Sequence, residues 1–415
     1  MEVEWFVGID WATTEHVVCL LDARGKVIGE RAFAHTGEGI AALCSWLFDK
    51  TGATTPAQIH VAIEVPRGAV VETLLERGLS VYSINPKQLD RFRDRFSVAG
   101  AKDDRLDAYV LANSLRTDRE RFHVLRIDEP VIIQLRAWSR IAEELSDERV
   151  RLMNRFREEL LRYYPQFLEV ADDIGRDWFL ALWELIPTPA KAKRINELKI
   201  ADLLLKRRVR SKNASEILAK LREEPLTVAP GSTEAAVAHI TSILPRLRLL
   251  NELIKTAETK LDELIELLQS EKEKKNEQSD ATILLSWPGI GRIVIATLLA
   301  EASQPLAARD YQSLRSLCGV APVTKATGKR SGPRATVVMR RACSVRLRDA
   351  VYYWAQAVIR HDPKSKALYA ALRARGKTHG RALRSVADRL LAVACVMLRN
   401  GSLYDPEKRK LATAA

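Results

Sequence analysis

Four acidic residues in the first quarter of the chain have the types and spacing that metal-dependent phosphodiester chemistry requires. Asp104 and Asp107 lie three residues apart in AKDDRLDA, at the expected start of a helix, so their carboxylates share one face. Asp10 in FVGIDWA and Glu64 in HVAIEVP each follow an apolar run, where an unpaired charge is costly. Neighbouring carboxylates repel unless a cation lies between them. The four acids therefore predict a two-metal site, provided that at least three of them reach one ion.

The segments around these acids predict an α/β domain over residues 1–125. Apolar periodicity gives this order: strands at 5–12, 16–22 and 27–34, a helix near 40–47, a strand at 59–65, a helix at 70–78, a strand at 81–84, and helices at 88–96 and 105–115. An antiparallel meander followed by parallel crossovers is the ribonuclease H-like, or RuvC-like, order. Actin-like and sugar-kinase ATPases also open with a strand, an Asp and a Thr-rich hairpin, but no glycine-rich phosphate loop follows here.

Composition favours a polyanionic partner. The 415 residues carry a net charge of +13, with 47% hydrophobic and 29% charged residues, which describes a soluble protein of two or three domains. Solubility alone could explain the charge, but clustering of Lys and Arg favours nucleic acid. The five cysteines form no CxxC pair and predict free thiols in a reducing cytoplasm. A nucleic-acid partner there implies association with the nucleoid. Neither a signal peptide nor a transmembrane run is expected.

The middle of the chain, residues 126–278, is predicted to be helical. Two apolar stripes have helical spacing, and the second alternates steps of three and four as a coiled-coil seam does; they are Leu135, Trp138, Ala142, Leu145, Leu152 and Phe156, and Leu247, Leu250, Ile254, Ala257, Leu261, Leu264 and Leu268. The seam could pack within the chain or between two subunits. Between the stripes lies a basic cluster that could be a solvated helix face or a contact to a nucleic-acid backbone: Lys191, Lys193, Arg194, Lys206, Arg207, Arg208, Arg210 and Lys212.

Residues 279–405 predict a third, helical domain, followed by a tail at 406–415. A PGIG turn at 288–291 separates two apolar helical runs, an arrangement that can present backbone N–H groups to a phosphate but that often only connects helices. A loop at 321–334, rich in Gly, Ser, Thr, Lys and Arg, precedes a helix predicted over 338–354. A hydroxyl in this basic loop could attack a phosphate, or the loop could only clamp one, and spacing alone favours the clamp.

Motifs at both ends of the chain give it a family resemblance. GIDWATTEH, AIEVP, the NP of INPKQ and AKDDRLDA resemble the catalytic half of the Piv-type DEDD transposases, an insertion-sequence family whose members are also called bridge-RNA-guided recombinases. WPGIG, CGVAP, SGPRATVVMRRAC and RLRDA resemble the C-terminal half of the same family. Both halves occur in the right order, which makes the resemblance far more specific than any single motif.

The resemblance implies a composite active site. Asp10, Glu64, Asp104 and Asp107 match the family's four acids and are expected to hold Mg²⁺; Asp103 stands where the family often has a hydroxyl residue. A serine in an SG dipeptide is the family's nucleophile. Ser331 matches it here, with Thr327 in a TG dipeptide as the reserve candidate, because threonine is stiffer at χ1. Contacts to nucleic acid are expected from Lys329, Arg330, Arg334, Arg340, Arg341, Gly289 and Gly291.

The function implied is transposition of an insertion sequence. Ser331 would attack a DNA phosphate and keep the bond energy as a phosphoserine ester, in a homodimer or homotetramer that a structured RNA guides to donor and target DNA. Two alternatives stay open. A RuvC-like Holliday-junction or structure-specific endonuclease would use activated water instead of Ser331. A scaffold without enzymatic activity would bind DNA unchanged after loss of the acids, and the intact set of four speaks against it.

Overall fold

The computed structural model describes residues 4–96, 103–273, 278–325 and 336–407 of the chain. Its internal packing divides it into two units, Met1–Asp128 and Glu129–Ala415. The three segments predicted from the sequence meet at residues 125/126 and 278/279, and the second of these boundaries falls within the second unit, where one hydrophobic core includes residues from both sides of it.

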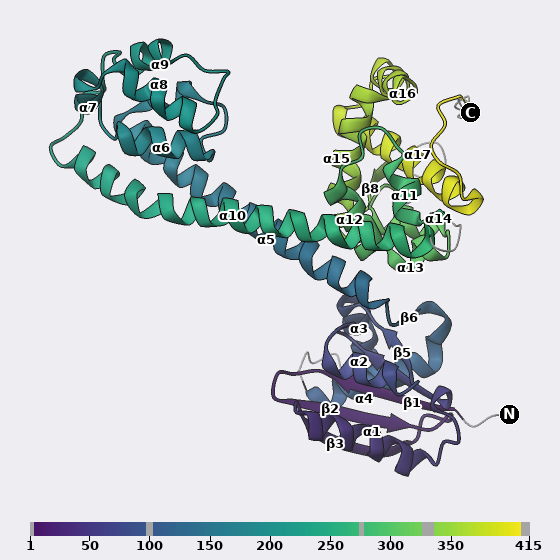
Figure 1. The fold of residues 1–415 in the computed structure, drawn as a ribbon. Coiled ribbons are helices and arrows are strands. Elements are labelled where there is room, and N and C mark those ends of the chain that lie inside the picture. Colours follow the sequence, from purple (N-terminus) through teal and green to yellow (C-terminus); the bar gives the residue numbers. More distant parts are fainter. Residues whose placement is uncertain (1–3, 97–102, 274–277, 326–335, 408–415) are drawn as a thin grey trace. The chain divides into compact units, whose positions relative to one another are not determined.

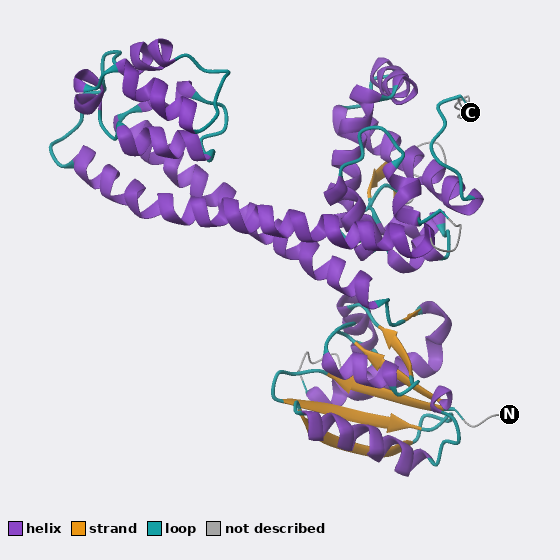
Figure 2. Ribbon diagram, in the orientation of Figure 1, coloured by secondary structure: helices purple, strands orange, loops and turns teal. Residues whose placement is uncertain are grey.

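The first unit is built on a six-stranded sheet with the strand order β3-β2-β1-β4-β5-β6 (Figures 1 and 2). Its strands are β1 (Trp5–Asp10), β2 (Glu15–Leu21), β3 (Val27–Ala34), β4 (Ile59–Ile63), β5 (Ser80–Ser83) and β6 (His123–Val124). The antiparallel β1–β3 meander and the parallel pairing of β4 with β1 and of β5 with β4 confirm the predicted order and are consistent with a ribonuclease H-like domain. The two-residue β6 was not predicted, because a strand so short leaves no periodic pattern.

Helices cover both faces of this sheet. The helices of the unit are α1 (Gly37–Thr51), η1 (Pro56–Gln58), α2 (Ala69–Glu76), α3 (Pro86–Arg93), α4 (Asp104–Asp118) and η2 (Arg119–Arg121). Alternate residues of β1 enter two separate cores: Val7 and Ile9 pack with α1 and α2, whereas Phe6 packs with α4. Five consecutive buried residues in β4 show why that strand lacks alternation, since both of its faces are covered.

Gly8 allows α4 to lie directly on β1. A Cβ atom added at Gly8 would stand 1.9 Å from the carbonyl oxygen of Ala108 and 2.6 Å from the amide nitrogen of Ala112, and both are backbone atoms of α4. Backbone in a packed helix cannot move aside cheaply. The position therefore requires glycine because of close approach, and the approach fixes the start of α4 relative to the end of β1.

Gly8→Ala is expected to destabilise the first unit by about 3 kcal/mol, because α4 must separate from β1 to admit the methyl group. Gly37→Ala is the matched control, since an added Cβ there meets nothing within 4 Å. The midpoint of chemical denaturation measures the loss of stability in each variant, provided that the dependence of the free energy of unfolding on denaturant concentration is unchanged. Equal midpoints for the two variants would contradict the close approach of α4.

The second unit begins with two long helices that pack along each other (Figure 1). The two long helices are α5 (Pro130–Tyr163) and α10 (Ser232–Glu273). Between them along the chain lie η3 (Pro165–Val170), α6 (Asp177–Leu185), α7 (Pro189–Arg194), α8 (Glu197–Lys206) and α9 (Ala214–Leu221). Ala257, Leu261 and Leu264 of the predicted seam are buried with Leu135 and Ala142 of the first stripe. The seam thus packs within the chain. We call residues 165–221 the helical lobe; its core includes Phe156 of α5.

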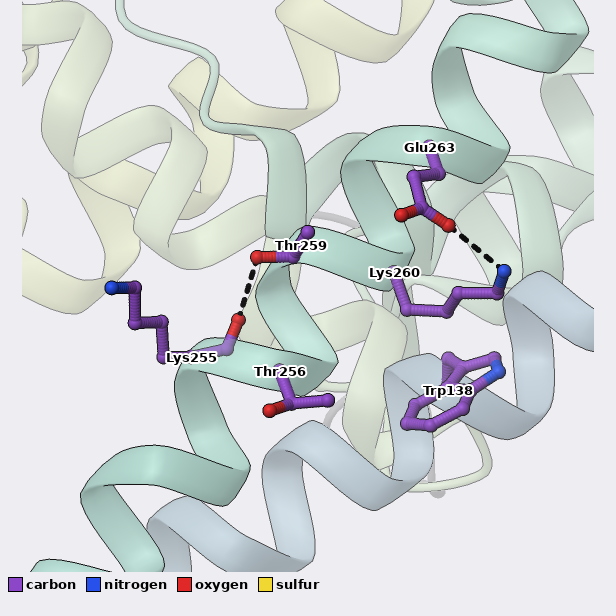
Figure 3. Close-up of a pocket in the computed structure, with 6 residues that line it drawn as sticks. All are labelled: Trp138, Lys255, Thr256, Thr259, Lys260 and Glu263. Atoms are coloured by element: carbon purple, nitrogen blue, oxygen red, sulfur yellow. Dashed lines mark hydrogen bonds and ion pairs between the residues drawn. The ribbon is translucent and has the colours of Figure 1, made fainter.

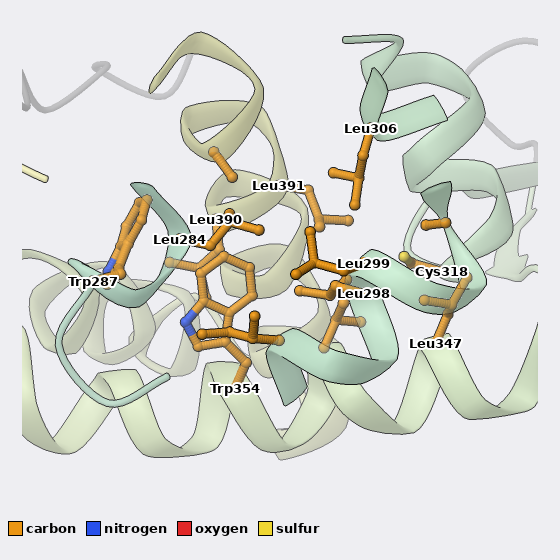
Figure 4. Packing of buried hydrophobic residues seen from close by; sticks show 14 of the residues in the cluster. Leu284, Trp287, Leu298, Leu299, Leu306, Cys318, Leu347, Trp354, Leu390 and Leu391 are labelled. Atoms are coloured by element: carbon orange, nitrogen blue, oxygen red, sulfur yellow. The ribbon is translucent and has the colours of Figure 1, made fainter. Parts of the chain in front are cut away.

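The C-terminal part of the unit packs around two perpendicular tryptophans. Its elements are α11 (Asp280–Leu285), α12 (Arg292–Glu301), α13 (Ser303–Ala307), α14 (Tyr311–Leu317), β7 (Pro322–Lys325), β8 (Thr336–Met339), α15 (Val345–His361), α16 (Pro363–Ala374) and α17 (His379–Asn400). The rings of Trp287 and Trp354 meet at 88° with centroids 5.5 Å apart (Figure 4). The last helix ends at Gly401, which adopts the left-handed conformation.

The prediction of a helix from residue 338 to 354 was wrong at its start. Thr336–Met339 is a strand that pairs with Pro322–Lys325, and the helix begins only at Val345. The β-branched run TVV favours a strand, and Ser344 caps the helix by accepting a hydrogen bond from the Leu347 amide. Arg340 and Arg341 consequently lie on the connection before the helix.

Two further expectations concern the cysteine thiols and membrane-spanning helices. The five cysteines are free; Cys343 is half-buried and the other four are buried. Burial raises the pKa of the Cys19 and Cys318 thiols to about 12, so both stay protonated and unreactive. Across the described residues, no helix combines the length and the hydropathy that crossing a membrane demands.

Candidate active site

Two of the predicted acids lie side by side at one edge of the sheet. Asp10 is the last residue of β1, and Glu64 directly follows β4, its parallel neighbour. Ile9 is paired with Ile63, so the two acids follow equivalent positions of adjacent strands. Both are half-buried. The carboxyl ends of parallel strands are where α/β domains commonly place ligand-binding groups.

The first turn of α4 carries the other two acids. Asp103 is the N-cap, and its side chain accepts a hydrogen bond from the Arg105 amide at 3.1 Å. This capping role explains the extra carboxylate in AKDDRLDA and leaves Asp104 and Asp107 in the helix. Asp104 is exposed, whereas Asp107 is only 3% exposed. Because Ala108 touches Gly8, which lies two residues before Asp10, the Asp107 end of α4 is held over the end of β1.

Asp107 already has a cation beside it. The Arg93 guanidinium of α3 donates from Nε to the Asp107 carboxylate at 2.6 Å and reaches Asp90 at 3.4 Å. Sequence reasoning missed Arg93, since PKQLDRFR resembles an ordinary solvated helix. The four acids supply the hard oxygen donors that Mg²⁺ prefers. In the arrangement that the structure describes, however, no three His, Cys, Asp or Glu side chains are grouped so that they could hold a metal ion.

An aromatic cluster follows Asp10 and was also missed. Buried His16 is the second residue of β2, and its Nδ1 accepts a hydrogen bond from the Ala12 amide at 3.4 Å. Its Nε2 lies 2.9 Å from Nδ1 of His35, and Trp11 stacks against it. Burial, followed by the neighbouring His35, lowers the pKa of His16, which favours the neutral ring. The cluster fixes the turn after Asp10, and the signal for it was the His in TTEH.

Arg93→Gln is expected to lower the stability of the metal-free chain by about 2 kcal/mol, because Asp107 loses the counter-charge of a buried carboxylate. A divalent ion should then raise the melting temperature more in the variant than in the wild type, since Arg93 and the ion compete for one carboxylate. Scanning calorimetry with and without Mg²⁺ measures the stability of each variant and the shift of its melting temperature caused by the ion. Asp90→Asn, which leaves the Arg93–Asp107 bond in place, is the control; equal ion-induced shifts in wild type and Arg93→Gln would contradict the competition.

The predicted C-terminal site is only partly described. Ser331, Thr327, Lys329, Arg330 and Arg334 lie outside the described residues. Strands β7 and β8 flank that segment, and the amide of Ser344 donates to the Leu317 carbonyl at 2.9 Å, which ties the start of α15 to the end of α14. The flanking strand pair was not predicted.

The other C-terminal candidates lie at two places along α15. Arg340 and exposed Arg341 precede its first turn. The PGIG turn lies near its other end, where Gly289 has a φ of 82° and a Cβ would stand 3.3 Å from the Ala357 backbone. Twelve helical residues separate these places, roughly 18 Å. Gly291 is the N-cap of α12. The structure thus separates the arginines from the PGIG turn, so one phosphate could not contact both.

A groove of about 420 Å³ lies between α5 and α10 (Figure 3). Its lining consists of Trp138, Lys255, Thr256, Thr259, Lys260 and Glu263. Lys260 forms an ion pair with Glu263 at 2.8 Å, and the Thr259 hydroxyl donates to the Lys255 carbonyl at 3.0 Å. These partners leave the groove without the paired carboxylates or activated nucleophile that hydrolysis would need.

Comparisons with known proteins follow this division of the chain. A transposase family model matches residues 7–165, and a model of the IS116/IS110/IS902 transposase family matches residues 281–370. Residues 166–280, which contain most of the helical lobe, lie outside both matches.

Several relatives carry transposon names. The putative transposase y4uE of Sinorhizobium fredii is 56% identical over 205 residues, which are 49% of this chain and 57% of that protein's length. The mini-circle putative transposase for IS117 of Streptomyces coelicolor is 29% identical over 411 residues, 97% of this chain and 96% of the relative. The IS110 uncharacterized 43.6 kDa protein of the same organism is 26% identical over 414 residues, again 97% and 96%.

Proposed function

Because the chain belongs to the IS110 family of DEDD transposases, enzymes that act on DNA, we propose that it transposes an insertion sequence through serine attack on DNA phosphate. The observation that carries the proposal is the placement of Asp10 and Glu64 after equivalent residues of adjacent parallel strands, together with the close approach of α4, which carries Asp107, to β1 at Gly8. This edge lies within the segment that matches the transposase model.

DEDD transposase domains typically use divalent metal ions, and here Asp10, Glu64, Asp104 and Asp107 would hold Mg²⁺. When bound, the ion supplies charge neutralisation to a phosphodiester and its attacking oxygen. The protein's own contribution is positional. The sheet edge and α4 present the acids from rigid elements, and Arg93 orients Asp107 and balances its charge until an ion arrives.

The proposed step is a transesterification. The Ser331 oxygen forms a bond to phosphorus, the bridging P–O bond of one strand breaks, and that strand leaves as a hydroxyl that receives the serine proton. One phosphate ester replaces another, so the bond energy is conserved and rejoining to a new strand needs no ATP. Thr327 is the reserve nucleophile. Lys329, Arg330, Arg334, Arg340 and Arg341 would neutralise the phosphate.

Guidance by a structured RNA and assembly into a homodimer or homotetramer complete the proposal. The net charge of +13 supports a nucleic-acid partner in addition to the DNA substrate. Exposed Leu249, Leu253 and Leu267 on α10 support assembly, because they remain outside the seam that packs within the chain.

The experiment that tests the proposal compares products. The purified chain is incubated with duplex DNA carrying the ends of its element and with the structured RNA transcribed from that element, in Mg²⁺ and in EDTA. A protein–DNA adduct that survives denaturation and forms only with Mg²⁺ is the expected result. Free 5′-phosphate ends without an adduct would instead establish the endonuclease that activates water, and DNA left intact under both conditions would overturn both assignments.

A further inference from the structure

We propose that residues 191–212 of the helical lobe, which we call the basic segment, bind the phosphate backbone of DNA, with Arg208 as a dedicated contact. The segment holds nine Lys and Arg residues and only two acids, a net charge of +7, which is about half of the +13 of the whole chain. It contains α7, α8 and the turn before α9, all outside the two family matches. The inference rests on the DNA substrate of the proposed function but on none of its catalytic residues.

Most cations of the basic segment are exposed and carry no counter-charge. Lys206 pairs with Asp202, and Arg207 pairs with Asp177. Among the described residues, no ion pair joins an acid to the remaining seven: Lys191, Lys193, Arg194, Lys199, Arg208, Arg210 and Lys212. Elsewhere in the same unit, Lys220 and Arg248 are each engaged by two acids. A run of unneutralised cations repels itself, and a polyanion relieves this repulsion.

Arg208 adopts a backbone conformation that favours glycine. Its φ is 55°, and two hydrogen bonds complete a C-terminal Schellman motif at α8: Arg208 N–H to the Leu205 carbonyl and Val209 N–H to the Leu204 carbonyl. Arg208 therefore occupies the position at which helices most often place glycine, and a side chain there strains the backbone. Strain of this kind is tolerated where the side chain has a function.

Apart from the glycines and Arg208, one described residue has a positive φ, and its side chain has an identifiable role. Arg309, also at 55°, donates to both carboxylate oxygens of Asp280, at 2.5 and 2.7 Å. That bidentate ion pair within the protein accounts for an arginine at a strained position. Arg208 makes no such bond to any described residue, which leaves its guanidinium available to a DNA phosphate.

The geometry of the basic segment suits a duplex. Its cations gather at both ends of α8, with Lys193 and Arg194 before the helix and Arg208 and Arg210 after it. The ten residues of α8 span roughly 15 Å. Over that length a DNA duplex presents about nine negative charges, so both ends can be engaged at once. Because no aromatic side chain interleaves the cations, the segment is suited to the backbone and not to unstacked bases.

A single substitution at Arg208 separates the effect on DNA binding from the effect on the stability of the protein. Arg208→Gly is expected to raise the melting temperature by about 1–2 °C, since the backbone strain is relieved. The same variant should bind a short DNA duplex of arbitrary sequence about tenfold more weakly. The slope of log K against log salt should become shallower by about 1, as one phosphate contact is lost. Binding is measured with the full chain in EDTA, so cleavage plays no part.

A triple variant and a matched control make the outcome decisive. Arg208→Gln, Arg210→Gln and Lys212→Gln together remove three unpaired charges, whereas Arg162→Gln, Lys220→Gln and Arg246→Gln remove three charges that are paired with Glu159, Glu169 and Glu148. Only the first set should flatten the salt slope, by about 3. Equal effects of the two sets, unchanged affinity in Arg208→Gly, or weakening towards duplex RNA alone would overturn the assignment. Loss of DNA cleavage with normal binding would leave it standing.

Discussion

Asp107→Asn is expected to reduce Mg²⁺-dependent DNA cleavage by about 10³-fold, the loss that several kcal/mol of transition-state stabilisation by a bound ion implies. The substitution keeps the volume of the side chain and its place in the first turn of α4, but it removes the negative charge that a divalent ion requires. Asp107 is the buried member of the four acids, so solvent and neighbouring side chains are least able to substitute for it. Single-turnover cleavage with excess enzyme measures the change.

Glu72→Gln is the control for this prediction. Glu72 is an acid in the first turn of α2, as Asp107 is in that of α4; it belongs to the same unit, is exposed and is not one of the four candidate acids. The Glu72→Gln variant should cleave DNA at the wild-type rate. A rate for Asp107→Asn within tenfold of wild type, in a variant that remains folded, would show that Asp107 is a structural partner of Arg93 and has no part in the reaction.

Ser331→Ala is expected to abolish the covalent protein–DNA adduct while leaving binding of the divalent ion intact. The alanine has no oxygen to attack phosphorus, whereas the acids on the other unit of the chain are untouched. Denaturing electrophoresis of radiolabelled DNA detects the adduct, and a calorimetric titration with Mg²⁺ checks the ion.

Thr327→Ala serves as the matched control, since it removes a hydroxyl from the same basic loop. It should retain the adduct. An adduct that persists in Ser331→Ala and disappears in Thr327→Ala would move the nucleophile to Thr327. Persistence in both variants would exclude both hydroxyls, and an absence of adduct in the wild type would favour attack by water.

The sequence predicted best what depends on local pattern. Asp10 and Glu64 could be placed at strand ends because both follow apolar runs of strand length, and both lie there. The i, i+3 relation of Asp104 and Asp107 is likewise local, and a helix that begins at Asp104 keeps it. The coiled-coil-like spacing from Leu247 to Leu268 correctly identified a long helix with a buried seam.

The features that the sequence failed to predict depend on contacts between distant segments. Neither the approach of Ala108 to Gly8 nor the bond from Arg93 to Asp107 leaves a periodic signal, because each joins residues on separate elements. Val338 and Met339 of the strand Thr336–Met339 were predicted to be helical, because the pairing partner of that strand, Pro322–Lys325, is distant in sequence. Local propensity cannot register a partner that the chain reaches only by folding.

The placement of a divalent ion in crystals of the chain with DNA, located by the anomalous scattering of Mn²⁺, tests the central claim most directly. The proposal predicts an ion within coordination distance of at least three of Asp10, Glu64, Asp104 and Asp107, with Arg93 displaced from Asp107. If the Mn²⁺ signal lies elsewhere while Arg93 remains on Asp107 and the four carboxylates stay apart, the acids do not form the catalytic centre.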